Sequence, residues 1–433
     1  MLTRRLVTAV LRVVARVFFR RVEVSGALEI PADAPVIFAA NHPNGLIDPL
    51  VLLCFAPRRI SFLAKAPLFR MPLVGWFARA FGSIPVYRQQ DGEATSRNRE
   101  TFTLARFLLS SGGAIAIFPE GTTHSEPRLL ELKTGAARIA LGCSMETAVN
   151  IVPVGLFYTA KQSFRSSVVI HFGKPIGAFS EVLDDNGEPP RASVERLTGE
   201  VERALRDLTL EADSQAALGL VGRASRIFSA GRGELASELE LQQRFVLGYA
   251  SLRASDPVRL AALESRVERF AAELGDARLE PEELVPPTLA GSVRTVSTLL
   301  LLLPPAIAGG LLHLPTYRLL GALVHRFCDE EEMAATMKTV GGLVAYPLTW
   351  LLLAALGWWL AAPWVGVCLM LFVPLLGYVA LRVFEQLDDV IGRARALTWR
   401  VARGQAYERL LAEQRSIRKE IVMLGEELQF PPM

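Results

Sequence analysis

Two long apolar runs near the carboxy-terminus limit what this chain can fold into. The first is VGGLVAYPLTWLLLAALGWWL, residues 340–360, and the second is WVGVCLMLFVPLLGYVAL, residues 364–381. Each run is long enough to cross the hydrocarbon core of a bilayer as a helix. Because only three residues, AAP, separate them, the sequence predicts a tight transmembrane hairpin.

An earlier apolar run, STLLLLLPPAIAGGLLHL at residues 297–314, is less regular. Pro304-Pro305 and Gly309-Gly310 stand at its middle, where they disfavour a straight helix, so we expect a bent or re-entrant segment. A full crossing stays open for residues 298–314. We place the membrane domain at 291–384 and a charged amphipathic helical segment at 385–433. The composition agrees with membrane association, since 51% of the residues are hydrophobic and the mean hydropathy is +0.30.

The amino-terminal 21 residues predict an amphipathic helix at the membrane surface. At about 100° per residue, several arginines share one helical face and a row of apolar side chains shares the other. The pattern is typical of a helix that lies in the bilayer interface, although a helix packed on the protein's own core would look alike. The arginine face holds Arg5, Arg12, Arg16 and Arg20, and the apolar face holds Leu6, Val10, Val13, Val14 and Val17.

Residues 22–183 alternate between strand-like and helix-like segments, which predicts an α/β sandwich with its site in the loops at strand ends. A turn-rich linker, DDNGEPPR, follows at 184–191, and residues 192–290 carry helical periodicity without strand signals, which indicates a helical domain. The expected strands are VIFAAN, ISFLAK, SIPVYR, AIAIFPEG, IVPVGLFY and VVIHFGKP, and the expected helices are PLVGWFARAF, RETFTLARFLLS and TGAARIALGC.

The stretch ANHPNGLIDPL, residues 40–50, holds the side chains best suited to catalysis. Pro43 and the turn pair Asn44-Gly45 would bring Asp48 back to His42, and a carboxylate fixes the tautomer of a histidine that acts as a base. A structural alternative is that Asp48 caps the helix that Pro49 begins.

Three further stretches favour a catalytic role for His42 and Asp48. FGSIPVYR ends in Arg88, FPEGTTHS contains Glu120 and Gly121, and IVPVGL contains Val152 and Pro153. In this order, over about residues 25–175, the four stretches resemble the four sequence blocks of the glycerolipid acyltransferases, which acylate glycerol 3-phosphate and 1-acyl-glycerol-3-phosphate.

The resemblance implies a role for each block. His42 would be the general base and Asp48 its orienting partner, while Arg88 would bind the phosphate of the acceptor. Glu120, Gly121 and Thr122 would position the acceptor, with a backbone N–H near Gly121 as a hypothetical oxyanion donor. Val152 and Pro153 would line the acyl groove.

Two departures from the family pattern stand out. Five residues, instead of four, separate His42 from Asp48, as in the branch that resembles yeast-type glycerol-3-phosphate acyltransferases with carboxy-terminal membrane segments. The third block reads GTTHS where GTRS is usual, so Arg128 or Lys133 would supply the missing positive charge. His124 has no carboxylate at a suitable sequence spacing, and we expect it to be non-catalytic.

The resemblance implies an enzyme that moves a fatty acyl group from acyl-CoA or acyl-carrier protein to a hydroxyl of 1-acyl-glycerol-3-phosphate. Glycerol 3-phosphate or another lysolipid is an alternative acceptor, and a non-catalytic lipid-binding protein is a second alternative. No metal or cofactor is implied, and a net charge of +3 gives no indication of nucleic-acid binding. The expected partners are membrane lipids and the acyl donor, while the oligomeric state stays open.

The charge pattern after the second long apolar run indicates the topology. Arginines at 382, 393, 395, 400 and 403 favour a cytoplasmic carboxy-terminus, and hence a catalytic domain on the cytoplasmic face of the cytoplasmic membrane.

Overall fold

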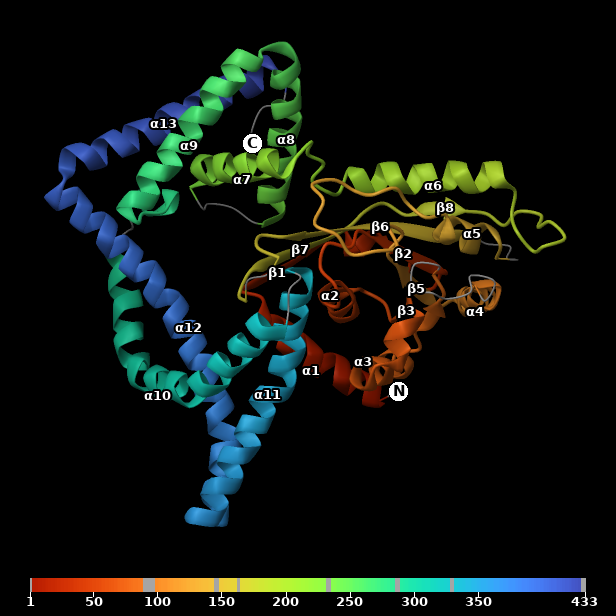
Figure 1. Cartoon of the computed structure of the whole chain (residues 1–433), viewed down its shortest axis with the longest axis horizontal. Coiled ribbons are helices and arrows are strands. Elements are labelled where there is room, and N and C mark those ends of the chain that lie inside the picture. The colour runs from red at the N-terminus through yellow and green to blue at the C-terminus, as the bar shows by residue number, and fades with distance from the viewer. Residues whose placement is uncertain are drawn as a thin grey trace. The chain divides into compact units, whose positions relative to one another are not determined.

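The computed structural model of the chain describes residues 2–88, 98–143, 148–161, 164–230, 235–284, 289–327 and 331–429. The chain divides into two compact units. One comprises Met1–Glu211 with Glu331–Thr336, and the other comprises Ala212–Glu330 with Met337–Met433. Figure 1 shows a sheet with covering helices in the first unit and helices in the second.

The first unit is built on one mixed sheet with the strand order β1-β7-β6-β2-β5-β3-β4, and β8 pairs with β6. Neighbours in the run β6-β2-β5-β3-β4 are parallel, whereas β6 pairs antiparallel with β7 and β8. The α/β expectation is therefore confirmed. The strands are β1 (Arg21–Ser25), β2 (Val36–Ala40), β3 (Ile60–Lys65), β4 (Ile84–Val86), β5 (Ala114–Ile117), β6 (Val149–Tyr158), β7 (Ser167–Phe172) and β8 (Ile176–Ala178).

Each face of the sheet is covered by its own helices, because side chains alternate between faces along a strand. On one face Ile37 and Ile115 join a core with α4 (Asn98–Ser110), α5 (Gly135–Leu141) and α6 (Arg191–Arg206). On the other face Phe38 and Val152 join a core with α2 (Ile47–Phe55). Figure 1 shows α6 and α2 on opposite sides of the sheet. The strands β1 and β8, which are short, were not predicted.

Helix α6 corrects the predicted domain boundary. We expected the α/β domain to end at 183 and the helical domain to begin at 192, but α6 belongs to the sheet unit. Its apolar residues lie in the same core cluster as β2 and β5, so the unit continues to Glu211. The buried side chains of α6 are Val194, Leu197, Val201 and Leu205.

Helix α1 (Leu2–Phe18) packs on the α/β unit with one side and exposes apolar residues on another. One side packs on the α/β unit, where Leu11 and Ala15 are buried beside Cys54 of α2. Arg12 donates from Nε to the carbonyl oxygen of Cys54 at 2.5 Å, so an arginine lies on the packed side. The row Leu6, Val10 and Val13 is exposed instead, with more than half of each side chain accessible. This exposed apolar row is what an interfacial helix requires.

Two further elements of the sheet unit, η2 (Ala66–Arg70) and α3 (Pro72–Ala80), follow β3.

The second unit is helical. Its core joins α7 (Gln215–Ser229), α9 (Pro257–Ala277) and α13 (Gly404–Glu427), and Arg266 of α9 binds Glu413 and Glu420 of α13 at 2.6 Å each. The second unit also contains α8 (Leu235–Ser255), α10 (Leu289–Phe327), α12 (Pro363–Ala402) and α11 (Glu331–Leu360) from Met337 onward.

Within the part of the chain that the structure describes, three helices of this unit are long and apolar enough to cross a membrane: Val296–Arg326, Val340–Leu360 and Pro363–Ala402. The predicted hairpin corresponds to the last two. Pro304, Pro305 and Pro315 do not break α10, which continues as a single helix, and Figure 1 shows it bent. A proline removes one backbone hydrogen bond and pushes against the preceding turn, so a long helix can absorb it as a kink.

Candidate active site

The candidate site lies where two neighbouring parallel strands end. His42 follows β2 and Glu120 follows β5, and these strands are paired in register at Ala39 and Ile117. Since parallel strands end at the same edge of a sheet, the loops after β2 and β5 meet there. The His124 N–H donates to the His42 carbonyl oxygen at 3.4 Å, which joins the two loops directly.

The loop after β2 closes on itself as the sequence predicts. His42 Nδ1 lies 2.8 Å from Asp48 Oδ2, and the backbone N–H of Asn44 donates to the same oxygen at 2.7 Å. Gly45 has a positive φ of 30°, which helps the turn accommodate the fifth intervening residue. Asp48 does not cap α2, because the N-cap position is Leu46 and has no side-chain cap bond.

The carboxylate of Asp48 is fully buried and is held at both oxygens. Its Oδ1 accepts a hydrogen bond of 2.6 Å from the Tyr158 hydroxyl at the end of β6. Burial, with the nearby Asp48 carboxylate, raises the pKa of Tyr158 well above its usual value, so the phenol stays a donor. Sequence reasoning missed Tyr158, because 110 positions separate it from Asp48.

The imidazole of His42 is held on its face as well as at Nδ1. Its ring stacks on Phe118, with the ring centroids 4.0 Å apart and the planes 17° apart. Among the residues that the structure describes, none hydrogen-bonds to His42 Nε2. With Asp48 accepting from Nδ1–H, the neutral tautomer presents the lone pair of Nε2, which is the form that a general base needs.

Glu120 fixes the loop after β5 to the loop after β2. Its Oε1 accepts from the backbone N–H of His42 at 2.8 Å, and its Oε2 accepts from the N–H of Leu130 at 3.0 Å. His124 Nε2 also bonds to Oε2, so our expectation that His124 lacks a carboxylate partner was wrong. The Glu126 N–H donates to His124 Nδ1 at 3.2 Å, so both ring nitrogens of His124 are occupied.

Arg88 and Lys133 lie beside Gly121, and Lys133, Arg128 and Thr122 are all exposed. Arg88 follows β4 and donates from a guanidinium nitrogen to the Gly121 carbonyl oxygen. The Cγ of Lys133 lies 3.5 Å from where a Cβ on Gly121 would stand. Of the two candidates for the missing positive charge, Lys133 is the one that lies near Gly121, the residue that Arg88 binds.

Gly121 turns the chain at this point, with a φ of 74°. Its N–H donates to the Phe118 carbonyl oxygen at 3.0 Å, so that amide is engaged within the turn and does not serve the oxyanion hypothesis. A positive φ strains any residue with a Cβ, and this explains why glycine suits the position.

Val152 and Pro153 do not have the surroundings expected of acyl-groove residues. Val152 is fully buried in the core between β6 and α2. Pro153 is also buried, and its carbonyl oxygen accepts from the Gly173 N–H at 2.8 Å. Val152 pairs with Phe38 and Pro153 with Ala39 of β2, in the strand that ends at Tyr158.

Comparison with known proteins finds a family match over the segment that carries the site. The model of the acyltransferase family matches residues 21–156. The chain contains an acyltransferase domain. This segment includes His42, Asp48, Arg88 and Glu120.

Two relatives show how far the similarity extends. Glycerol-3-phosphate O-acyltransferase 1 of Saccharomyces cerevisiae is 25% identical over an alignment that covers 78% of this chain and 57% of the yeast protein. The 1-acyl-sn-glycerol-3-phosphate acyltransferase alpha of Mus musculus is 30% identical, with 43% of this chain and 60% of the mouse protein covered. The chain thus spans less than two thirds of either relative.

Among solved structures, the chain is similar to the 1-acyl-sn-glycerophosphate acyltransferase PlsC from Thermotoga maritima. The two are 22% identical with a TM-score of 0.35, and the match covers 47% of this chain and 80% of that one.

Proposed function

We propose that the protein is a membrane-bound acyltransferase of phospholipid synthesis that acylates a hydroxyl of 1-acyl-glycerol-3-phosphate. The acyl donor is acyl-CoA or acyl-carrier protein. The observation that carries the proposal is the His42–Asp48 pair, in which a buried carboxylate holds Nδ1 and presents Nε2 to a substrate. A positioned base of this kind is what acyl transfer to an alcohol requires.

The reaction follows from this geometry in two steps. His42 Nε2 takes the proton of the acceptor hydroxyl as the oxygen attacks the thioester carbonyl carbon, which forms a C–O bond and a tetrahedral intermediate. The intermediate then collapses, the C–S bond breaks, and the imidazolium returns the proton to the departing thiolate. Asp48 stabilises the imidazolium between the two steps. No acyl-enzyme is formed, so no nucleophilic side chain is needed.

Glycerol 3-phosphate is a second candidate acceptor, and one observation favours it. The alignment with the yeast glycerol-3-phosphate acyltransferase covers 78% of this chain, whereas that with the 1-acyl-sn-glycerol-3-phosphate acyltransferase LPAT1 of Arabidopsis thaliana covers 38%.

An acyl-transfer assay with the protein in nanodiscs identifies the acceptor. The donor is radiolabelled acyl-CoA or acyl-carrier protein, and the acceptors compared are lysophosphatidate, glycerol 3-phosphate and 1-monoacylglycerol. Incorporation into none of the three would overturn the proposal, in favour of another lysolipid acceptor or of a non-catalytic lipid-binding protein.

A phosphate on the acceptor would be bound by Arg88 and Lys133, which both lie near Gly121. We expect Arg88→Ala to raise the KM for a phosphorylated acceptor and to leave 1-monoacylglycerol little affected. Arg99→Ala is the matched control, because Arg99 is exposed and binds Asn186. Equal losses with both acceptors would reject phosphate binding by Arg88. Comparison of Lys133→Ala with Arg128→Ala tests which side chain supplies the second charge.

The exposed row Leu6, Val10 and Val13 of α1 would lie in the headgroup region of the cytoplasmic leaflet, next to the amphiphilic substrates. A spin label at position 10 should be more accessible to oxygen than to a water-soluble nickel complex, and the reverse should hold at the exposed Arg16. Equal, water-like accessibility at both positions would reject the placement. The cytoplasmic orientation is tested by protease digestion of sealed inverted vesicles, in which the acyltransferase domain should be cleaved.

A further inference from the structure

Asp48 is held by more than the loop that carries His42. Its Oδ2 accepts from His42 Nδ1 and from the Asn44 N–H, and its Oδ1 accepts from Tyr158. We infer that Tyr158 is a positioning residue, whose hydroxyl fixes the plane of the Asp48 carboxylate and sets how strongly that carboxylate stabilises protonated His42. The inference rests on the proposed function of His42.

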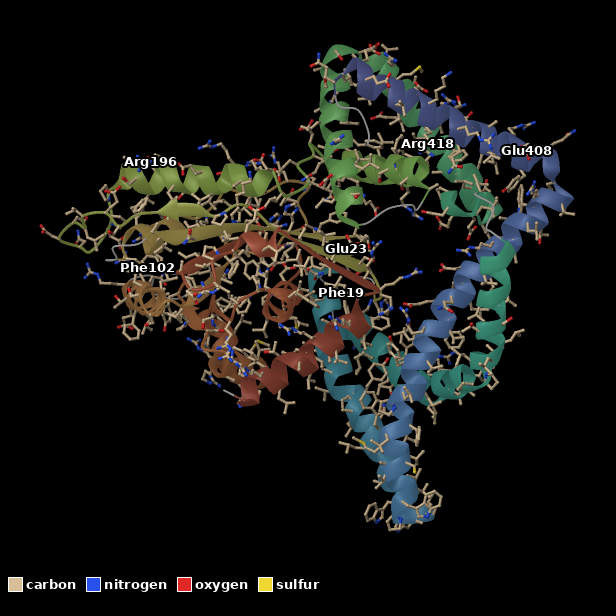
Figure 2. The ribbon with its side chains drawn as sticks, turned by 180° about the vertical axis from the view of Figure 1, so that it is seen from behind. Phe19, Glu23, Phe102, Arg196, Glu408 and Arg418 are labelled. Carbon is tan, nitrogen blue, oxygen red and sulfur yellow. The ribbon has the colours of Figure 1, made fainter. Side chains whose placement is uncertain are left out.

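The position of the Tyr158 hydroxyl is determined by the core of the sheet unit. Tyr158 is the last residue of β6 and is paired in register with Val168 of β7. Tyr158 is 6% exposed, and its ring packs against the ring of Phe19, with the centroids 5.9 Å apart. Figure 2 labels Phe19 beside the end of α1. The hydroxyl therefore approaches Asp48 from a strand and a core that the loop after β2 does not control.

The direction of this hydrogen bond is unambiguous. An ionised carboxylate only accepts, so the phenol donates. Burial raises the pKa of Tyr158 well above its usual value, so the donor keeps its proton over the range in which a histidine titrates. By drawing negative charge toward Oδ1, the phenol weakens the pull of Asp48 on the imidazolium.

Removal of the hydroxyl should therefore change the pH profile in a defined direction. In Tyr158→Phe the carboxylate charge concentrates on the side of His42, the imidazolium is better stabilised, and the acidic limb of kcat/KM moves to higher pH by about 0.5 pH units. The carboxylate also loses one of its anchors, so kcat should fall about 5- to 30-fold while the KM for the acceptor changes little.

A second variant keeps the ring, its volume and its hydrogen bond. Replacement of Tyr158 by 3-fluorotyrosine makes the phenol more acidic and a stronger donor, so the acidic limb should move to lower pH. This opposite shift decides the question even if Tyr158→Phe does not fold. The matched control is Tyr407→Phe, because Tyr407 is equally buried and its hydroxyl donates one hydrogen bond, of 3.0 Å, to the Leu284 carbonyl oxygen.

The readout that separates this inference from the proposed function is the titration of His42 by NMR. The chain has five histidines, so ¹³Cε1-labelled histidine gives few signals, and the signal lost in His42→Gln identifies His42. We expect its midpoint to rise in Tyr158→Phe, to fall with 3-fluorotyrosine and to stay unchanged in Tyr407→Phe. An unmoved midpoint in both Tyr158 variants would overturn the inference. Absence of acyl transfer by the wild-type protein would instead overturn the proposed function.

Discussion

The loops after β2 and β5 each place one histidine against one buried carboxylate, but they use the pair differently. In the loop after β2, Asp48 binds two side chains, His42 and Tyr158, together with one backbone amide. In the loop after β5, Glu120 binds one side chain, His124, together with two backbone amides. The surroundings of each pair, rather than the two residue types, therefore indicate its role.

The difference lies in which atoms remain for a substrate. His42 is bound through Nδ1, whereas His124 is bound through Nε2 to Glu120 and through Nδ1 to Glu126. A histidine with both nitrogens occupied must give up a hydrogen bond before it can accept a proton. The His42–Asp48 pair is arranged for proton transfer. The His124–Glu120 pair joins the loop that carries Gly121 to the loop that carries His42.

The largest effect that tests this comparison is expected for His42→Ala. Loss of a positioned general base should lower kcat by about 10³-fold, with the thermal unfolding transition close to that of the wild type. Activity is measured by acyl incorporation and folding by circular dichroism. His325→Ala is the control, since His325 is an exposed histidine of α10. Near-normal turnover by His42→Ala would show that the His42–Asp48 pair is not catalytic, and the proposed difference from the His124–Glu120 pair would be wrong.

Glu120→Gln should have the second largest effect, because it affects both loops. The amide keeps an acceptor for the His42 N–H, but its NH₂ group faces the Leu130 N–H and His124. We expect the free energy of unfolding to fall by about 1–3 kcal/mol, as for a buried donor without a partner. Activity should fall about 10- to 100-fold through displacement of His42. Denaturant titration and steady-state kinetics measure the two effects, and a fully active, equally stable variant would contradict the structural role of Glu120.

His124→Gln should change stability more than chemistry. Loss of its bond to buried Glu120 should lower the free energy of unfolding by about 1 kcal/mol. We expect kcat to stay within about threefold, a change of at most roughly 0.7 kcal/mol in barrier, and the acidic limb of the pH profile to stay in place. A loss as large as that of His42→Ala, or a shifted limb, would show that His124 takes part in proton transfer.

The smallest effect is expected for Gly121→Ala, which tests the turn rather than either pair. At a φ of 74° an added Cβ strains the backbone by about 1 kcal/mol, although its nearest neighbour would be Lys133 Cγ at ordinary contact distance. Gly187→Ala is the control, because Gly187 has a φ of 75° in open surroundings. If both variants lose similar stability but only Gly121→Ala raises the KM for the acceptor, the turn at Gly121 has a role in binding. Equal KM values would restrict Gly121 to the fold.

Much of the sheet and one of the two pairs could be predicted from the sequence. The alternation of apolar and turn residues placed β2, β3, β4, β5, β6 and β7, and the turn chemistry of Pro43 and Asn44-Gly45 brought Asp48 to His42. The partner of His124 was missed because a spacing of four residues predicts contact in a helix, whereas here an irregular loop produces it. Helix α6 was assigned to the wrong unit because its periodicity shows that a face is buried but not against what.

The sequence by itself determined the local features: apolar runs long enough to span a bilayer, strands that alternate with helices, and a turn that pairs His42 with Asp48. These depend on residues close together in the chain, where side-chain period and backbone preference act directly. Only the tertiary structure decided that Tyr158 completes the hold on Asp48, that Glu120 ties the two loops together, and that Lys133 lies beside Gly121. Such contacts depend on strand order and register, which arise from the packing of the whole sheet and leave no periodic signal in the chain.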